Sequence, residues 1–366
     1  MVDVYASNID GYGNYRIPAL LKLCNGTLLA FCEARQFLSD HAQNKIVLKR
    51  SFDNGESWGE MQIIADAGTD ALNNPLVVQD QDTFDILLMY QKYPNTTTSE
   101  IDNPNQWKSH ATQNFPANIH EGAVVDGYEG KVCRTYMQRS VDNGVSWSEP
   151  ENITNQVKRP LKVTSYAGGP GVGIELKNGK NKGRFIMPFS QGPWGEMKVY
   201  AVFSDDKGKS WQYGEVAPTE NNVQANEVQM AEIADGSIIL NARSFNGNKL
   251  RKTAYSEDGG MSWSQLRDAK DLLEPECQGS MISFYKNYSF HSLIYCGPSD
   301  EKYRKNGILW QSTNNGLSWQ KLILVYNEFF GYSSIQQLEN QSIGVLFERD
   351  DYAKISFKLI SNNTIQ

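Results

Sequence analysis

The chain has 366 residues, 40% of them hydrophobic, a length that suits one large repetitive domain or two ordinary ones. Its 35 lysines and arginines against 42 aspartates and glutamates give a net charge of -7, which argues against a nucleic-acid-binding protein because such proteins carry a basic footprint. No run approaches the roughly 20 apolar residues of a membrane helix, so no transmembrane segment is expected.

The first residues, Met1-Val2-Asp3-Val4-Tyr5, show neither the basic nor the apolar segment of a secretory leader. The compartment stays open: secreted or lysosomal if a leader was removed, and cytoplasmic otherwise. The five cysteines form no Cys-x-x-Cys pair and the four histidines no His-Glu-x-x-His motif. We therefore expect no metal in a catalytic site and no cofactor, and leave a structural calcium open.

The N-terminal region contains three polar segments ahead of the first regular repeat. They are Tyr15-Arg16-Ile17-Pro18-Ala19-Leu20, Phe31-Cys32-Glu33-Ala34-Arg35 and Ser39-Asp40-His41. The run Lys45-Ile46-Val47-Leu48 follows, and its β-branched residues predict a strand. That strand leads into the octapeptide Ser51-Phe52-Asp53-Asn54-Gly55-Glu56-Ser57-Trp58.

The octapeptide is the first of five copies of the pattern Ser-x-Asp-x-Gly-x-Ser-Trp, which we call the box. The later boxes start at Ser140, Ser204, Ser256 and Ser312, and Asn314 replaces the aspartate in the last one. With 30 glycines and 8 tryptophans, about 0.7 Gly-x-x-Trp matches are expected by chance. Five matches with the same flanking residues therefore identify a true internal repeat.

Each box has the composition of a tight hairpin loop. Aspartate and serine side chains can accept hydrogen bonds from backbone amides two or three residues further on, and glycine tolerates a positive φ. Strand-like runs such as 198–203 flank the boxes, and no long amphipathic helix is found. Box starts are 89, 64, 52 and 56 residues apart, an interval that suits one four-stranded sheet per repeat.

Five boxed units and the tail after Trp319 predict an all-β, six-bladed β-propeller with box hairpin loops, formed by residues 1–366 as a single domain. The tail contains three strand-like runs, at 332–335, 343–347 and 355–357. A strand from near the N-terminus could complete this sixth blade and close the ring. The extra length between the first two boxes falls in 93–128, which predicts a long surface loop.

The boxes resemble the Asp boxes of sialidases, although the same boxes occur in other propellers and specify architecture only. The remaining motifs resemble the exo-α-sialidases of bacteria and animals (glycoside hydrolase family 33) in chain order. These are the segments of Arg16, Arg35 and Asp40 given above, then Asn74-Pro75, Asn226-Glu227-Val228-Gln229-Met230-Ala231-Glu232, Leu240-Asn241-Ala242-Arg243-Ser244, Glu276-Cys277-Gln278-Gly279-Ser280, Arg304, Gly331-Tyr332-Ser333-Ser334 and Leu346-Phe347-Glu348. His41 to Lys45 follow the animal-type enzymes more closely than many bacterial ones.

The resemblance implies that Arg16, Arg243 and Arg304 bind the carboxylate of a sialic acid, because guanidinium groups recognise carboxylates through a planar, permanently charged fork. Glu348 would pair with Arg16 and orient it. Arg35 is expected as a supporting substrate contact and Asn74 as a weaker one.

The catalytic residues that the resemblance implies are Asp40, Glu227 and Tyr332. A neutral tyrosine avoids the repulsion that a carboxylate nucleophile would meet beside the substrate carboxylate, and Glu227 would take its proton. Asp40 would act as general acid and then as general base. Asp53, Asp66 and Asp70 compete with Asp40 for this role. Glu232 competes with Glu227, and on a regular strand their odd separation would put them on opposite faces.

The expected function is a retaining exo-α-sialidase that removes terminal α-linked sialic acids from glycoproteins, glycolipids or oligosaccharides. A trans-sialidase would share these residues and differ in an aromatic acceptor site, for which Trp107 and Trp194 are unassigned candidates. A sialic-acid-binding lectin would be expected to lack Asp40, Glu227 or Tyr332, and an unrelated Asp-box binding propeller would not need the arginine motifs. Linkage preference and oligomeric state stay open.

Overall fold

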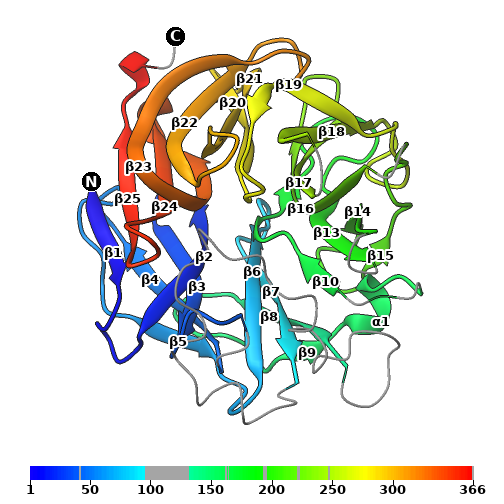
Figure 1. Ribbon diagram of the computed structural model, residues 1–366. Helices are drawn as coiled ribbons and strands as arrows, with labels where there is room; N and C mark the ends of the chain where they lie inside the picture. Colours follow the sequence, from blue (N-terminus) through cyan, green and yellow to red (C-terminus); the bar gives the residue numbers. More distant parts are fainter. Residues whose placement is uncertain are drawn as a thin grey trace.

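The computed structural model describes residues 1–40, 43–94, 132–160, 163, 165–192, 196–220, 223–245 and 248–364. Almost every regular element is a β-strand, and the strands form sheets around a common axis (Figure 1). The short helical elements are α1 (Thr154–Val157) and the 3-10 turns η2 (Glu339–Gln341) and η3 (Asn362–Thr364). No helix in the described part of the chain is long and apolar enough to cross a membrane.

The first four blades are antiparallel sheets built from consecutive segments of the chain. Blade one contains β2 (Asn14–Lys22), β3 (Leu28–Arg35), β4 (Lys45–Ser51) and β5 (Gln62–Ala65). Blade two contains β6 (Ala71–Gln79), β7 (Ile86–Tyr93), β8 (Arg134–Ser140) and β9 (Glu151–Asn152), with β11 (Gly171–Val172) added parallel to β6. Blade three contains β10 (Ser165–Gly168), β13 (Phe185–Gly192), β14 (Lys198–Ser204) and β15 (Gln212–Tyr213), with β12 (Ile174–Glu175) paired to β13. Blade four contains β16 (Gln224–Glu232), β17 (Ile238–Phe245), β18 (Leu250–Ser256) and β19 (Arg267–Leu273).

Blades five and six share one long strand, β23 (Gln320–Gln337). Its first half pairs with β22 (Lys305–Ser312), next to β21 (Ser289–Pro298) and β20 (Ser280–Lys286), and these strands form blade five. Its second half pairs with β24 (Ile343–Arg349), which pairs with β25 (Lys354–Ile360), in blade six. The outer strand of blade six is β1 (Val2–Ala6), antiparallel to β25, so the predicted N-terminal closing strand is confirmed.

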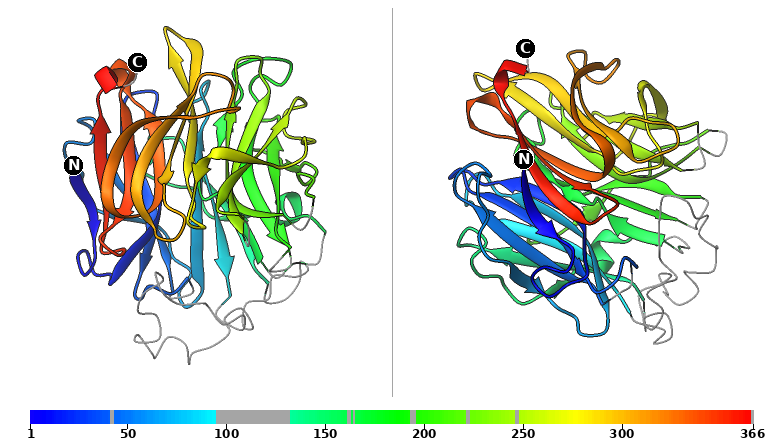
Figure 2. Two further views of the ribbon diagram at one scale, coloured as in Figure 1. Left: turned by 45° about the horizontal axis from the view of Figure 1, so that its top comes forward. Right: turned by 60° about the vertical axis from the view of Figure 1, so that its left-hand side comes forward.

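The core lies between the blades. Within the described residues, six apolar clusters fill the six interfaces between neighbouring blades, including the interface between blades six and one. In this last cluster Leu346 and Phe357 of blade six pack with Leu20 and Leu28 of blade one. Figure 2 shows the blades from two sides, with the N-terminal and C-terminal strands next to each other. The predicted six-bladed propeller is therefore the observed fold.

The boxes form the loops between the third and fourth strands of blades one to five, as their composition predicts. In box two, Gly144 N donates to Ser140 Oγ at 2.8 Å and Ser146 N donates to Asp142 Oδ1 at 2.8 Å. The other boxes repeat these bonds, and every box glycine has a positive φ of 77° to 87°. Backbone N–H groups of the loop thus find their hydrogen-bond acceptors within the loop itself.

Each box also contacts the blade before it. Tyr255 of blade four donates to Asn315 O of box five at 2.9 Å, and Arg139 of blade two donates to Lys207 O of box three at 2.8 Å. A Cβ added to Gly316 would lie 2.4 Å from Ile239 Cδ1, so the preceding blade approaches the glycine too closely for a side chain. The boxes therefore close individual loops and hold adjacent blades together.

Candidate active site

Four inner strands are interrupted by β-bulges at one end of the ring, near the N-terminal ends of β2, β6 and β16 and at the point where β23 passes from blade five into blade six. The register shifts fall between Arg16 and Ala19 in β2, Asn73 and Leu76 in β6, Ala225 and Val228 in β16, and Phe330 and Ser333 in β23. Three predicted site residues stand in these bulges, Asn74, Glu227 and Tyr332, and Arg16 directly precedes the bulge in β2. A bulge re-aims a side chain away from the regular alternation of a strand, so the strand irregularities and the candidate residues coincide.

Tyr332, Glu227 and Arg243 form a triangle of direct contacts. The Tyr332 hydroxyl donates a short hydrogen bond to Glu227 Oε1. Arg243 Nη1 donates to Glu227 Oε2 at 2.8 Å and to the Tyr332 oxygen at 3.2 Å. Burial raises the pKa of Tyr332 well above its usual value, and the charge of Glu227 raises it further, while three arginines oppose the shift. The phenol thus keeps its proton in this state and directs it at Glu227.

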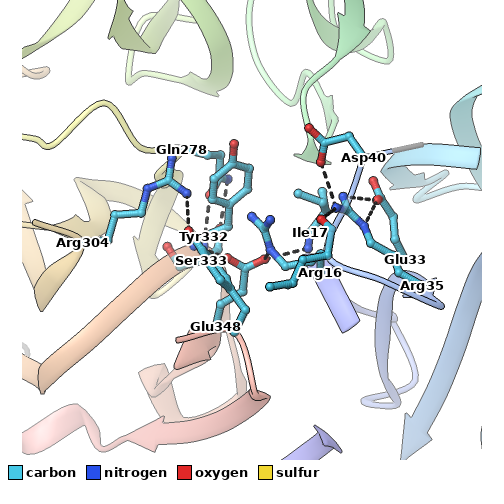
Figure 3. A network of polar contacts seen from close by, with 12 residues as sticks. Arg16, Ile17, Glu33, Arg35, Asp40, Gln278, Arg304, Tyr332, Ser333 and Glu348 are labelled. Carbon is cyan, nitrogen blue, oxygen red and sulfur yellow. Dashed lines mark hydrogen bonds and ion pairs between the residues drawn. The ribbon is translucent and has the colours of Figure 1, made fainter. Parts of the chain in front are cut away.

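The two other predicted arginines flank the same tyrosine. The guanidinium carbons of Arg16 and Arg304 lie 5.2 and 5.4 Å from the centre of the Tyr332 ring. Figure 3 shows Arg16 and Arg304 on either side of Tyr332. Together with Arg243, three cationic groups from blades one, four and five therefore surround the Tyr332 side chain, an arrangement suited to an anionic ligand.

Glu348 joins two of the bulges. This side chain is fully buried, and its Oε1 accepts bonds from Arg16 Nε at 2.7 Å and from Ile17 N at 2.8 Å. Its Oε2 accepts a bond from Tyr332 N at 2.9 Å. Ile17 itself has φ of 61°, a strained value for a β-branched residue. One carboxylate therefore fixes the backbone on which both Arg16 and Tyr332 stand.

Arg35 and Asp40 lie on the other side of Arg16 in Figure 3, together with Glu33. Arg35 Nη1 donates to Asp40 Oδ1 at 2.8 Å, and Arg35 Nε donates to Glu33 Oε2 at 2.8 Å. Asn74 reaches this group through its backbone, because its N–H donates to Glu33 Oε1 at 2.6 Å. The structure thus brings Arg35, Asp40 and Asn74 together around Glu33.

The competing carboxylates lie elsewhere. Glu232 accepts bonds from Lys177 N and Asn178 N, at 2.8 and 2.7 Å, near the far end of β16. The bulge at 226–227 breaks the strand's alternation, so the argument from odd spacing does not apply to Glu227 and Glu232. Asp66 pairs with Lys45 at 2.5 Å, and Asp53 accepts bonds within its own box.

Three residues around the site were not singled out from the sequence. The Tyr352 hydroxyl accepts a bond from Arg304 Nη1 at 2.8 Å, and its ring centre lies 4.1 Å from the guanidinium carbon of Arg16. Gln278 makes two 3.0 Å bonds to the backbone of Ser333, next to Tyr332. Glu33 is the third. The sequence offered two signals: the Asp350-Asp351 turn after β24, which precedes Tyr352, and the position of Glu33 within its motif. Neither signal indicates which side chain the residue contacts.

Some candidates of the sequence lie outside the described residues. These are Trp107, Trp194 and residues 95–128 of the predicted long loop.

In the described part of the chain, one group of three carboxylates is close enough together to hold a metal ion: Asp80, Asp82 and Glu175. Lys207 Nζ lies 2.8 to 2.9 Å from an oxygen of each carboxylate. The ammonium group thus offsets part of the negative charge of this cluster, which joins blades two and three and contains no residue of the candidate site.

Comparison with known proteins gives a consistent family. Residues 26–345 match the model of the BNR repeat-like domain. A sialidase of Micromonospora viridifaciens is 27% identical over 357 residues, which cover 94% of this chain and 51% of that protein. Sialidase-2 of Rattus norvegicus is 26% identical over 383 residues, covering 95% of this chain and 92% of that protein. The chain therefore spans about half the length of the bacterial relative and nearly all of the animal one.

Among solved structures, an intramolecular trans-sialidase from Ruminococcus gnavus in complex with oseltamivir carboxylate superposes with a TM-score of 0.78. The two chains are 19% identical, and the match covers 99% of this chain and 98% of that one. At this identity the likeness supports the fold.

Proposed function

This chain belongs to the BNR repeat-like domain family, and from that membership and the geometry of its site we propose that it is a retaining exo-α-sialidase. Its substrates would be terminal α-linked sialic acids on glycoproteins, glycolipids or oligosaccharides. We further propose that residues 1–366 act as one catalytic propeller domain.

The observation that carries the proposal is the convergence of Arg16, Arg243 and Arg304 on the side chain of Tyr332, with Glu227 as the hydrogen-bond acceptor of its hydroxyl. A sialic acid carries an ionised carboxylate on its anomeric carbon. If the arginines bind this carboxylate, the anomeric carbon is brought next to the Tyr332 oxygen. Each charge-assisted bond would contribute about 1.5–3 kcal/mol to binding.

In the first step, the Tyr332 oxygen would attack the anomeric carbon while its proton passes to Glu227 Oε1. A neutral phenol meets no electrostatic repulsion from the substrate carboxylate, and sialidases with a tyrosine nucleophile are an established exception to the two-carboxylate scheme of glycosidases. Asp40 would protonate the leaving glycosidic oxygen.

In the second step, a water molecule would attack the same carbon and displace the Tyr332 oxygen. Asp40 would take a proton from this water, and Glu227 would return its proton to the Tyr332 oxygen. Two inversions at one carbon give net retention, so the α-anomer would form first. Glu348 supports both steps by holding the backbone of Ile17 and Tyr332 and the side chain of Arg16.

The proposal is tested by proton NMR of the protein acting on an aryl α-sialoside. We expect the α-anomer of free sialic acid as the first product, followed by slow mutarotation. A first-formed β-anomer would contradict the double displacement. Binding of sialic acid without any cleavage would favour the lectin alternative, and a sialylated acceptor in place of free sialic acid would favour the transferase.

A further inference from the structure

The surroundings of Asp40 conflict with its proposed role. A general acid has to hold a proton when the substrate is bound. The Asp40 side chain is 59% exposed and lies 2.8 Å from the guanidinium of Arg35. Both solvent and a neighbouring cation favour an ionised carboxylate. A role as general acid therefore needs a feature of the site that opposes these two influences.

Glu33 supplies a second carboxylate on the other side of the same guanidinium. Its side chain is fully buried, and its Oε2 accepts bonds from Arg35 Nε at 2.8 Å and from Arg35 Nη2. One positive charge is therefore shared by two carboxylates. When Glu33 is ionised, it already balances Arg35, and a second negative charge on Asp40 is less favourable.

Glu33 and the Asp40 loop also share their other hydrogen-bond donors. Asn73 Nδ2 lies 3.3 Å from Glu33 Oε2 and 2.8 Å from Asp40 O. Asn44 Nδ2 lies 3.4 Å from Glu33 Oε2 and 2.7 Å from Asp40 O. The buried carboxylate is thus the common anchor of the three side chains that hold the loop carrying Asp40.

We infer that Glu33 is a positioning residue for the acid step: its buried carboxylate anchors Arg35 and the loop that carries Asp40. In its ionised form it also takes up the charge of Arg35 and so opposes loss of the proton that Asp40 transfers to the leaving oxygen. This inference rests on the proposed function and deepens it. Glu33 itself touches no reacting atom, because it acts through Arg35 and the loop.

The two carboxylates are electrostatically coupled, and Glu33 takes its ionised form only as the pH rises through about 7. Burial raises the pKa of Glu33 to about 7, the charge of Asp40 raises it as well, and Arg35 and the Asn74 amide lower it. Coupling between two titrating groups is mutual, so the charge of Glu33 opposes ionisation of Asp40 in the same way.

The other ionisable groups around the pair come from neighbouring strands. On β2, Arg16 is the register partner of Glu33. On β4, Lys45 pairs with Asp66, and on β7, burial together with the charges of Asp40 and Glu33 raises the pKa of Tyr93. His41, next in sequence after Asp40, lies outside the described residues, and a His41→Gln control separates its titration from that of the pair.

The test compares Glu33→Gln with Glu232→Gln, a matched substitution of another buried glutamate at the far end of the propeller. Two substrates are used: a sialyl-lactose, whose sugar leaving group needs a proton, and 4-nitrophenyl α-sialoside, whose leaving group needs little help. We expect Glu33→Gln to lower kcat/KM for sialyl-lactose by at least about 10-fold and for the nitrophenyl substrate by less than about 3-fold. The alkaline limb of its sialyl-lactose profile should move to lower pH, and Glu232→Gln should match the wild type.

An equal loss on both substrates, or a loss that lies in KM alone, would make Glu33 a support for binding and overturn the inference. An unchanged Glu33→Gln enzyme would overturn it too. If the wild type cleaves neither substrate, the proposed function fails, and this outcome is distinct from both results.

A second measurement does not depend on Glu33→Gln folding. Carboxyl ¹³C NMR of the wild type and of Asp40→Asn would follow the titration of Glu33. We expect its midpoint to fall by at least about 0.5 pH unit once the charge of Asp40 is removed, because the two carboxylates share one guanidinium. The same midpoint in both proteins would show that they are uncoupled and would overturn the inference.

Discussion

The two ends of the propeller use carboxylates in opposite ways. At the box end, Asp53 is exposed and accepts bonds from the side chain and backbone of Ser57, and these bonds lower its pKa to about 2. At the site end, Glu33 is fully buried beside Arg35, and burial raises its pKa to about 7. The two ends are separated by the length of the sheets, since Ser51 pairs with Leu28 while Ile46, at the start of the same strand, pairs with Glu33.

The two ends differ because their side chains find hydrogen-bond partners at different distances along the chain. A box finds all its main partners within eight residues, so each loop is complete in itself. The site takes its partners from separate blades: Glu348 lies 332 residues from Arg16, and Tyr332 lies 105 residues from Glu227. The box end therefore stabilises the ring repeat by repeat, whereas the site exists only when the ring is assembled.

Loss of the Tyr332 hydroxyl should have the largest effect on the site end. Tyr332→Phe removes the proposed nucleophile, and we expect kcat to fall by at least about 10³-fold while binding of a sialic-acid analogue stays within a few-fold. Arg243→Ala is the matched contrast, because it should weaken analogue binding by about 10-fold or more. Steady-state kinetics and calorimetry check both. Near-normal turnover by Tyr332→Phe would show that the nucleophile is assigned wrongly.

The pH dependence of stability should separate the two ends. The pKa of Glu33 is about 7 in the folded protein and 4.5 in an ordinary glutamate. The raised pKa contributes its full stabilisation of the folded protein below about pH 4.5, and this contribution is lost as the pH rises through about 7. Glu33→Gln cannot ionise, and relative to the wild type it should gain up to about 3 kcal/mol between pH 4.5 and pH 8. Denaturant unfolding at both pH values measures this gain.

The box aspartates have the opposite sign, because their lowered pKa makes their contribution present above about pH 4 and lost toward pH 2. The contribution of the box aspartates to stability is the same in the wild type and in Glu33→Gln, so it cancels when the two proteins are compared. A difference between the two proteins that does not change with pH would contradict the assignment of Glu33.

Tyr352 offers a smaller perturbation of the site end. Tyr352→Phe keeps the ring beside Arg16 but removes the hydroxyl that accepts the 2.8 Å bond from Arg304. One such bond contributes about 0.5–1.5 kcal/mol, so analogue affinity should fall by about 2- to 10-fold with little change in unfolding free energy. Unchanged affinity would mean that Tyr352 does not orient Arg304.

The smallest effect is expected at the box end. In box five Asn314 takes the place of aspartate and keeps the same bonds, since Ser318 N donates to its Oδ1 at 3.0 Å and its Nδ2 donates to Ser318 Oγ at 2.8 Å. Asp142→Asn should therefore cost less than about 1 kcal/mol of unfolding free energy, and Asp142→Ala about 1–2 kcal/mol. Sialoside hydrolysis should be unchanged in both, and a loss of activity would show that the two ends are coupled.

The same contrast explains what the sequence could predict. The boxes, the six blades and the closing strand β1 were predictable because local composition and spacing determine them. The pairing of Glu348 with the backbone of Tyr332 was not, because strand alternation carries no information about where a bulge interrupts it. Tyr352 was missed for a related reason, because only the assembled ring brings Arg304 next to it. Glu33 was missed because the strand pattern does not show that the loop after Arg35 returns Asp40 to the guanidinium that Glu33 also binds.

The most direct test of the central proposal is to trap the enzyme with a 2,3-difluorosialic acid and to map the adduct by peptide mass spectrometry. The fluoride on the anomeric carbon leaves as the adduct forms, and the fluorine on the neighbouring carbon slows breakdown of the covalent intermediate. We predict a single adduct on the peptide that contains Tyr332, and none in Tyr332→Phe. An adduct on the peptide of Glu227 or Asp40, or turnover of sialosides without any covalent adduct, would contradict the double displacement through Tyr332.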